Sequence, residues 1–149
     1  MITTGAVSVS QALMVNQTLL QLIMNGNTIG DDGIIAIAAT LGNSNITVLS
    51  VEECGITFAG VKSLATALSA NQNVRIIGLY NNSITVDGAH LIMQSAVDNG
   101  VCQHVRISGE YWDDHKVKEM MTILYDRERQ HVKVMFCDII IIVVITGKQ

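Results

Sequence analysis

The sequence predicts an α/β fold in which strand–helix units stack into a right-handed solenoid with a parallel sheet on its inner side. Two observations predict it. Gly33, Gly60 and Gly88 follow one another at intervals of 27 and 28 residues, and an isoleucine stands four residues before each. Apolar or small residues recur one, four, five and eight positions after each glycine, which is the spacing of one helix face. A period of about 20 to 50 residues indicates stacked units rather than one closed globule.

A strand-forming segment precedes each of these glycines. The three aligned segments are residues 19–29, 46–56 and 74–84. Apolar residues fill the first, fourth and sixth positions and should point into the core, because successive strand residues point to opposite faces of a sheet. The ninth position holds Asn27, Cys54 and Asn82. We expect these side chains to satisfy backbone groups where the strand ends.

The aligned segments resemble the leucine-rich repeat, whose pattern is L-x-x-L-x-L-x-x-N/C-x-L. Units of 27 and 28 residues that include a full helix resemble the ribonuclease-inhibitor-like subclass. That subclass also forms the C-terminal arrays of NOD-like receptors and the GTPase-activating protein of Ran. The resemblance covers residues 1–136 and is strongest in the middle. It implies a horseshoe arc of about four to five repeats, with strands on the concave side and helices on the convex side.

We therefore expect one leucine-rich repeat domain over residues 1–149. Its units are a half repeat at 1–18, clear repeats at 19–45, 46–73 and 74–101, a degenerate repeat at 102–130, and a strand, cap or tail at 131–149. In the degenerate repeat, a helix is expected from His115 to Arg129. A further strand is expected around residues 132–136. The aliphatic run from Ile139 to Ile145 is too short to span a membrane, and it predicts either a terminal strand or an aggregation-prone segment.

Several residues near the helix ends have expected structural roles. The three repeating glycines should open the helices, and Asp32 and Asp87 should cap them. Four residues lie eleven positions after their glycines: Asn16, Ser44, Asn71 and Asn99. The asparagines among them fit a left-handed helix terminator.

Composition excludes several classes of function. The net charge is −4, from nine basic and thirteen acidic residues, and no basic patch typical of nucleic-acid binding is present. No secretory signal or membrane span is visible. The three cysteines are an odd number and form no CxxC pair. We therefore predict a cytoplasmic protein that binds neither nucleic acid nor membrane.

The sequence predicts no enzyme, no cofactor and no metal site. It contains no HExxH, GxSxG, phosphate-binding or dinucleotide-binding motif. The four histidines are interpreted as surface residues. Asp113, Asp114 and His115 could hold a metal, but the acidic pair is better explained as a helix cap.

The candidate site is the concave face of the sheet. Its expected partner-binding residues are Asn25, Ser50, Glu52, Glu53, Arg75, Tyr80, Asn81, His104 and Arg106. Tyr and Arg are enriched at binding hot spots, and we expect Tyr80 to neighbour both Glu52 and Ser108. The competing interpretation is that these polar side chains only stabilise the sheet.

The predicted function is protein–protein interaction through this face, with the partner's identity open, as a small member or a fragment of a larger receptor or scaffold. The fragment interpretation rests on the absence of a strand before the first helix. An alternative is regulation of a small GTPase, as the resemblance to the Ran protein implies. The strand at residues 19–24 would leave a sheet edge open, which predicts self-association there.

Overall fold

A computed structural model describes residues 4–108, positions 113, 115, 118, 119 and 122, and the strands at 132–137 and 140–145. Strands and helices alternate in the order that the repeats predict. The described elements are α1 (Thr4–Val15), β1 (Gln21–Ile23), α2 (Gly30–Ala38), the 3₁₀ turn η1 (Leu41–Asn43), β2 (Val48–Ser50), α3 (Phe58–Ala70), β3 (Ile76–Gly78), α4 (Val86–Asn99), β4 (His104–Ser108), β5 (Val132–Cys137) and β6 (Ile140–Ile145). The helix expected from His115 to Arg129 lies largely outside the described residues.

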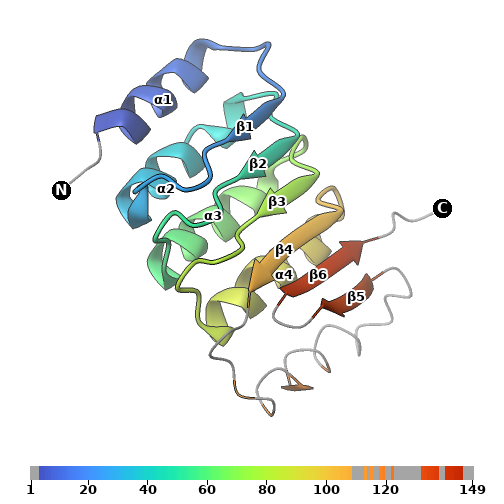
Figure 1. Cartoon of the computed structure of the whole chain (residues 1–149). Helices are drawn as coiled ribbons and strands as arrows, with labels where there is room; N and C mark the ends of the chain where they lie inside the picture. Colours follow the sequence, from blue (N-terminus) through green and yellow to red (C-terminus); the bar gives the residue numbers. More distant parts are fainter. Residues whose placement is uncertain are drawn as a thin grey trace.

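The strands form one six-stranded sheet in the order β1-β2-β3-β4-β6-β5 (Figure 1). The first four pair in parallel and in register, so that Leu22, Leu49, Ile77 and Val105 lie side by side. Each crossover between them contains a helix, as parallel neighbours require. The predicted α/β solenoid with a parallel sheet is confirmed.

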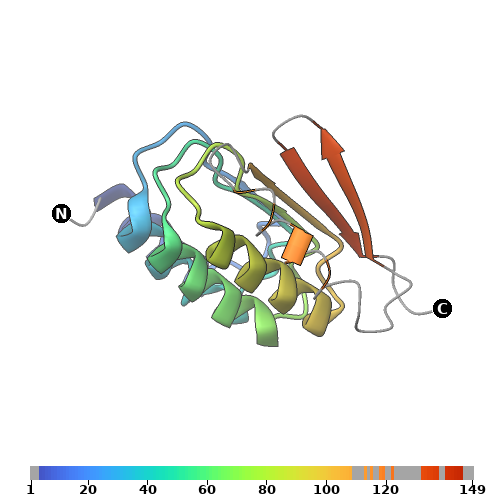
Figure 2. The ribbon, with the colours of Figure 1, turned by 90° about the horizontal axis from the view of Figure 1, so that it is seen from below.

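The helices cover one face of the sheet and leave the other open, which we call the concave face (Figure 2). The core lies between the two layers. In the second repeat the three inward strand positions, Ile46, Leu49 and Val51, are fully buried, and so are Val61 and Leu64 of α3. The same strand positions are buried in the third and fourth repeats, so the inward direction predicted for them is confirmed.

Asn82 satisfies backbone groups at the strand end, as predicted. Its Nδ2 donates to the carbonyl oxygens of Val51 and Leu79 at 2.9 and 3.0 Å, while its Oδ1 accepts from the amides of Cys54 and Ile56 at 3.0 Å. One side chain therefore joins two neighbouring repeats. Cys54 substitutes for asparagine in its own repeat, and its thiol donates to the carbonyl of Met24 at 3.2 Å.

The predicted helix caps are wrong. Asp32 and Asp87 lie in the first turns of α2 and α4. Thr85 caps α4, since its hydroxyl oxygen accepts from the Gly88 amide at 3.2 Å. The repeating glycines do not begin the helices either, because each lies two or three residues inside one. Close approach explains Gly60 better: a Cβ there would lie 2.5 Å from Cγ2 of Ile34 on the preceding helix.

The asparagines after the helices do not adopt the left-handed conformation. Among the described non-glycine residues, only Glu53 and Asn81 have positive φ. Asn71 instead closes an Asx turn, in which its Oδ1 accepts from the Asn73 amide at 2.8 Å, and its Nδ2 donates to the Leu41 carbonyl at 2.9 Å. Asn99 repeats this one unit later by donating to the Asn71 carbonyl at 2.8 Å. The side chains thus link successive repeats.

The parallel order ends at β4, because β6 pairs with β4 in the antiparallel direction and β5 pairs with β6. The terminal strand predicted for the aliphatic run is confirmed, and it covers the end of the parallel stack. The strand predicted around residues 132–136 exists as β5, but it lies at the outer edge rather than beside β4. Only two residues separate β5 from β6, which favours an antiparallel hairpin.

Candidate functional site

The concave face presents three rows of side chains that cross the four parallel strands. Strand register defines the first two rows. The first row is Gln21, Val48, Ile76 and His104; the second is Ile23, Ser50, Gly78 and Arg106; the third, at the strand ends, is Asn25, Glu52, Tyr80 and Ser108. Two hydrogen bonds support the third row: the Glu53 amide donates to the Tyr80 carbonyl, and the Asn81 amide donates to Ser108 Oγ.

An ion pair crosses the middle of this face. Glu52 Oε1 lies 3.2 Å from the guanidinium of Arg106, although β3 lies between their strands. Gly78 makes this possible, since a Cβ there would lie 2.9 Å from Glu52 Oε1. The Glu52 side chain is 15% exposed and the Arg106 side chain 46%. The carboxylate is therefore held in place, while part of the guanidinium remains open to solvent.

Asn25 extends this network to the first repeat. Its Oδ1 accepts from Ser50 Oγ and from the Glu52 amide, both at 2.9 Å. Its Nδ2 donates to the second carboxylate oxygen of Glu52 at 3.4 Å. Four polar side chains, from β2, β4 and the loops after β1 and β2, are thus fixed relative to one another.

Glu53 and Asn81 follow the third row and are exposed. Both have φ of 54°, and the equivalent residue in the first repeat, Gly26, has φ of 72°. A left-handed turn after each strand requires this conformation, which costs a residue other than glycine conformational energy. These two side chains project at the rim of the face.

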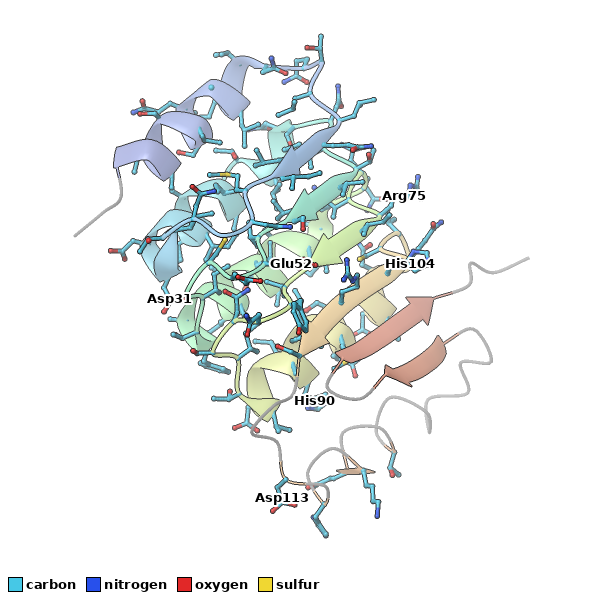
Figure 3. All side chains as sticks on the ribbon, in the orientation of Figure 1. Asp31, Glu52, Arg75, His90, His104 and Asp113 are labelled. Atoms are coloured by element: carbon cyan, nitrogen blue, oxygen red, sulfur yellow. The ribbon has the colours of Figure 1, made fainter. Side chains whose placement is uncertain are left out.

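Arg75 and His104 lie apart from the ion pair. Figure 3 shows them at the side of the sheet where the strands begin, with Glu52 toward the side where the strands end. They are adjacent through the backbone, since the His104 amide donates to the Arg75 carbonyl at 3.0 Å. The structure therefore divides the nine predicted residues into an acidic and polar group, a basic group, and Arg106 between them.

Two residues outside the predicted set also shape this region. Gly78 was not assigned a role, although its lack of a side chain lets Glu52 reach Arg106. Asp31 caps the helix of the next repeat: its Oδ1 accepts from the amides of Thr57 and Gly60 at 2.8 and 3.0 Å. A glycine inside a strand signals such a close approach, whereas no local sequence signal pairs Asp31 with Thr57.

The two cysteines whose side chains the structure describes, Cys54 and Cys102, carry no reactive thiolate. Cys54 and Cys102 are buried and free. Burial raises the pKa of the Cys102 thiol to about 12 and also raises the pKa of Cys54. Both thiols are therefore protonated near neutral pH, and the thiolate is the nucleophilic and metal-binding form.

The described residues contain no group of three or more His, Cys, Asp or Glu side chains placed to hold a metal. Asp113, from the run considered above, accepts from the His115 amide at 2.7 Å, as a capping residue does; Asp114 lies outside the described residues. No described helix is long and apolar enough to span a membrane.

Comparison with known proteins agrees with this geometry. The family model described as Leucine Rich repeat matches residues 15–38 and 42–65. Human NACHT, LRR and PYD domains-containing protein 5 is 35% identical over 89 residues, which are 58% of this chain and 7% of that protein. Pig ribonuclease inhibitor is 31% identical over 109 residues, which are 71% of this chain and 24% of the inhibitor. The chain thus spans less than a quarter of the length of these two relatives.

Solved structures share the fold at lower identity. A structure titled Leiomodin-1 Actin-Binding Site 2 superposes with a TM-score of 0.70 at 14% identity, covering 83% of this chain and 73% of that one. The C-terminal domain of Caenorhabditis elegans tropomodulin gives a TM-score of 0.54 at 14% identity and covers 84% of this chain and 94% of its own. At this identity the likeness concerns the fold alone.

Proposed function

Since the chain is a leucine-rich repeat protein of the ribonuclease-inhibitor-like subclass, we propose that it binds a protein partner through the concave face of its sheet. The family relationship indicates a non-catalytic interaction module. The binding residues we propose are the nine predicted above: Asn25, Ser50, Glu52, Glu53, Arg75, Tyr80, Asn81, His104 and Arg106. The unit boundaries given above, within one domain over residues 1–149, are part of the same proposal.

The ion pair between Glu52 and Arg106 is the observation that carries this proposal. Arg106 is half-exposed, and an ion pair open to solvent contributes at most about 1 kcal/mol to stability. The protein nevertheless leaves a glycine in β3 beneath this pair, and glycine weakens a strand. An arrangement that costs strand stability and fixes a half-exposed guanidinium is better explained by recognition than by stability. Fixed side chains lose less conformational entropy when a partner binds.

The charges indicate the kind of partner surface that fits. Glu52 and Glu53 lie where the strands end, Arg75 and His104 lie where they begin, and Tyr80 stands beside Glu52 in the third row. A partner with basic groups facing the first side and acidic groups facing the second would complement this face. Such a complex should associate more slowly at high salt, because electrostatic steering is screened.

Affinity capture with purified variants tests the site. Glu52→Lys reverses the charge at the centre of the network, and Tyr80→Ala removes the aromatic side chain. We expect both variants to lose proteins that the unmodified chain retains. Lys62→Glu is the matched control, because Lys62 is exposed on α3, on the opposite side of the sheet, and should retain them. Equal capture by all four proteins, each with an unchanged circular dichroism spectrum, would remove the site assignment.

We propose a cytoplasmic location on the basis of the two free, buried cysteines. Protein thiols stay reduced in the cytosol, whereas secreted domains usually pair theirs. Among the described residues, no observation favours regulation of a small GTPase over simple binding. The self-association predicted for the strand at residues 19–24 stays a prediction.

A further inference from the structure

The ion pair between Glu52 and Arg106 lacks an aligned hydrogen bond. Nη1 of Arg106 lies 3.2 Å from Oε1 of Glu52, yet this oxygen is buried and has no hydrogen-bond partner among the described residues. A guanidinium N–H that does not point along the line from nitrogen to oxygen contributes charge attraction but little hydrogen bonding. The contact therefore holds the guanidinium in place without using its donors.

Arg106 consequently keeps its donors free on the concave face. A guanidinium carries five N–H groups in a planar fork and stays charged in proteins. Within the part of the chain that the structure describes, Glu52 is the only acidic partner of this side chain, and 46% of the side chain is exposed. Such a fork can bind an oxyanion through two parallel N–H bonds.

The two strands around Arg106 carry no acidic residue. Strands β3 and β4 contain His104 and Arg106 but no Asp or Glu. His104 lies two residues before Arg106 in β4, so both belong to the same face of the sheet. On β3 the register partner of Arg106 is Gly78, which places no side chain beside the guanidinium. The field here favours a negatively charged group, and the neighbouring strand leaves room for it.

The charges close to Arg106 favour a carboxylate over a phosphate. Glu52 already balances the guanidinium, and Glu53, which is exposed, follows it in the chain. A carboxylate adds one negative charge, whereas a phosphate monoester adds about 1.5 to 2 near neutral pH. Both groups match the geometry of the fork. The carboxylate meets the smaller repulsion, since repulsion grows with the charge of the incoming group.

We propose that Arg106 is the anchor for an aspartate or glutamate side chain of the protein partner. The carboxylate accepts two parallel hydrogen bonds from the guanidinium, while Glu52 keeps that guanidinium over the sheet. This inference rests on the concave-face binding proposed above, and it assigns to one residue of that face the chemical group that it binds.

Peptides selected on the unmodified chain from a random phage-displayed library are the probes. Fluorescence anisotropy measures the Kd of each peptide, before and after its Asp and Glu residues are changed to Asn and Gln. We expect at least one acidic residue to be required, and Arg106→Gln should raise the Kd at least about tenfold. Combining Arg106→Gln with the peptide change should cost little more than either change alone, because both remove the same contact.

Two further variants separate the fork from the charge. Arg106→Lys keeps the positive charge but not the planar fork, so it should still raise the Kd several-fold. Lys62→Gln is the matched control, because it removes a positive charge from the exposed side of α3, across the sheet from the site; its Kd should not change. Circular dichroism checks that each variant is folded.

The outcomes distinguish the anchor from concave-face binding as a whole. Peptides that Tyr80→Ala weakens but Arg106→Gln does not would overturn the anchor and leave concave-face binding in place. The anchor is also refuted if no selected peptide requires an acidic residue, or if Arg106→Lys binds as tightly as the unmodified chain. Peptides that depend on neither Tyr80 nor Arg106 would count against both proposals.

Discussion

The two faces of the parallel sheet follow different rules. On the face toward the helices, the same three positions of every strand carry apolar or thiol side chains, and from the second repeat onward all of them are fully buried or nearly so. On the concave face, the second row changes from Ile23 to Ser50 to Gly78 to Arg106. Repetition on one face builds the stack, and variation on the other gives each unit a different surface.

The largest expected difference between the faces comes from two adjacent residues of β3. Ile77 is fully buried, whereas Ile76 is half-buried and belongs to the first row. Ile77→Ala should reduce the free energy of unfolding by about 2–5 kcal/mol, because it leaves a cavity in the core. Ile76→Ala should cost about 1 kcal/mol or less. Urea denaturation of the two variants measures the difference, and equal losses would contradict the assignment of the faces.

A second comparison uses two glycines that both lack room for a side chain. At Gly60 an added Cβ would meet Cγ2 atoms of Ile34 and Ile56 at 2.5 and 2.9 Å, and these atoms belong to the packed core. Gly60→Ala should therefore cost about 1–3 kcal/mol of stability.

At Gly78 the nearest atoms would be Ser50 Oγ and Glu52 Oε1, at 2.7 and 2.9 Å. These are the ends of flexible side chains that can move aside. Gly78→Ala should change stability by less than about 1 kcal/mol but displace Glu52 from Arg106. Unfolding titrations of both variants check the stabilities, and a Gly78→Ala loss as large as that of Gly60→Ala would refute the distinction.

The smallest expected effect is a pH dependence from the buried thiol of Cys102. Its pKa rises from 9.0 to about 12 on folding, so the thiol stays protonated in the fold while the unfolded chain loses the proton. The free energy of unfolding keeps its full value well below pH 9 and falls as pH rises through the pKa of the unfolded chain. Linkage gives a loss of about 1 kcal/mol near pH 10. The Cys102→Ala variant should lack this part of the loss. The same pH dependence of the free energy of unfolding in the variant and the unmodified chain would contradict the prediction.

The sequence could predict what repeats. Apolar positions, the Asn or Cys at each strand end and the period between glycines specify the stack, because each is a local pattern copied from unit to unit. The sequence could not predict those contacts between repeats that are not copied from one repeat to the next. Asp31 and Asn71 hydrogen-bond to groups 26 to 30 residues away, and nothing in their own segments names those partners. The antiparallel pairing of β6 could not be predicted either, because the aliphatic run from residue 139 to 145 predicts a strand but not the direction in which it pairs.

The carboxylate of Asp31 also has a consequence for how the chain unfolds. The Asp31 carboxylate belongs to α2 and caps the first turn of α3. Melting of α2 would therefore leave the amides of Thr57 and Gly60 without this acceptor. Unsatisfied groups at a helix start favour fraying, and a lost cap costs about 1 kcal/mol. Neighbouring units in such an array stabilise one another through their interfaces. Thermal opening that starts in the first repeat would therefore spread into the second, so that the two units lose structure as one cooperative block.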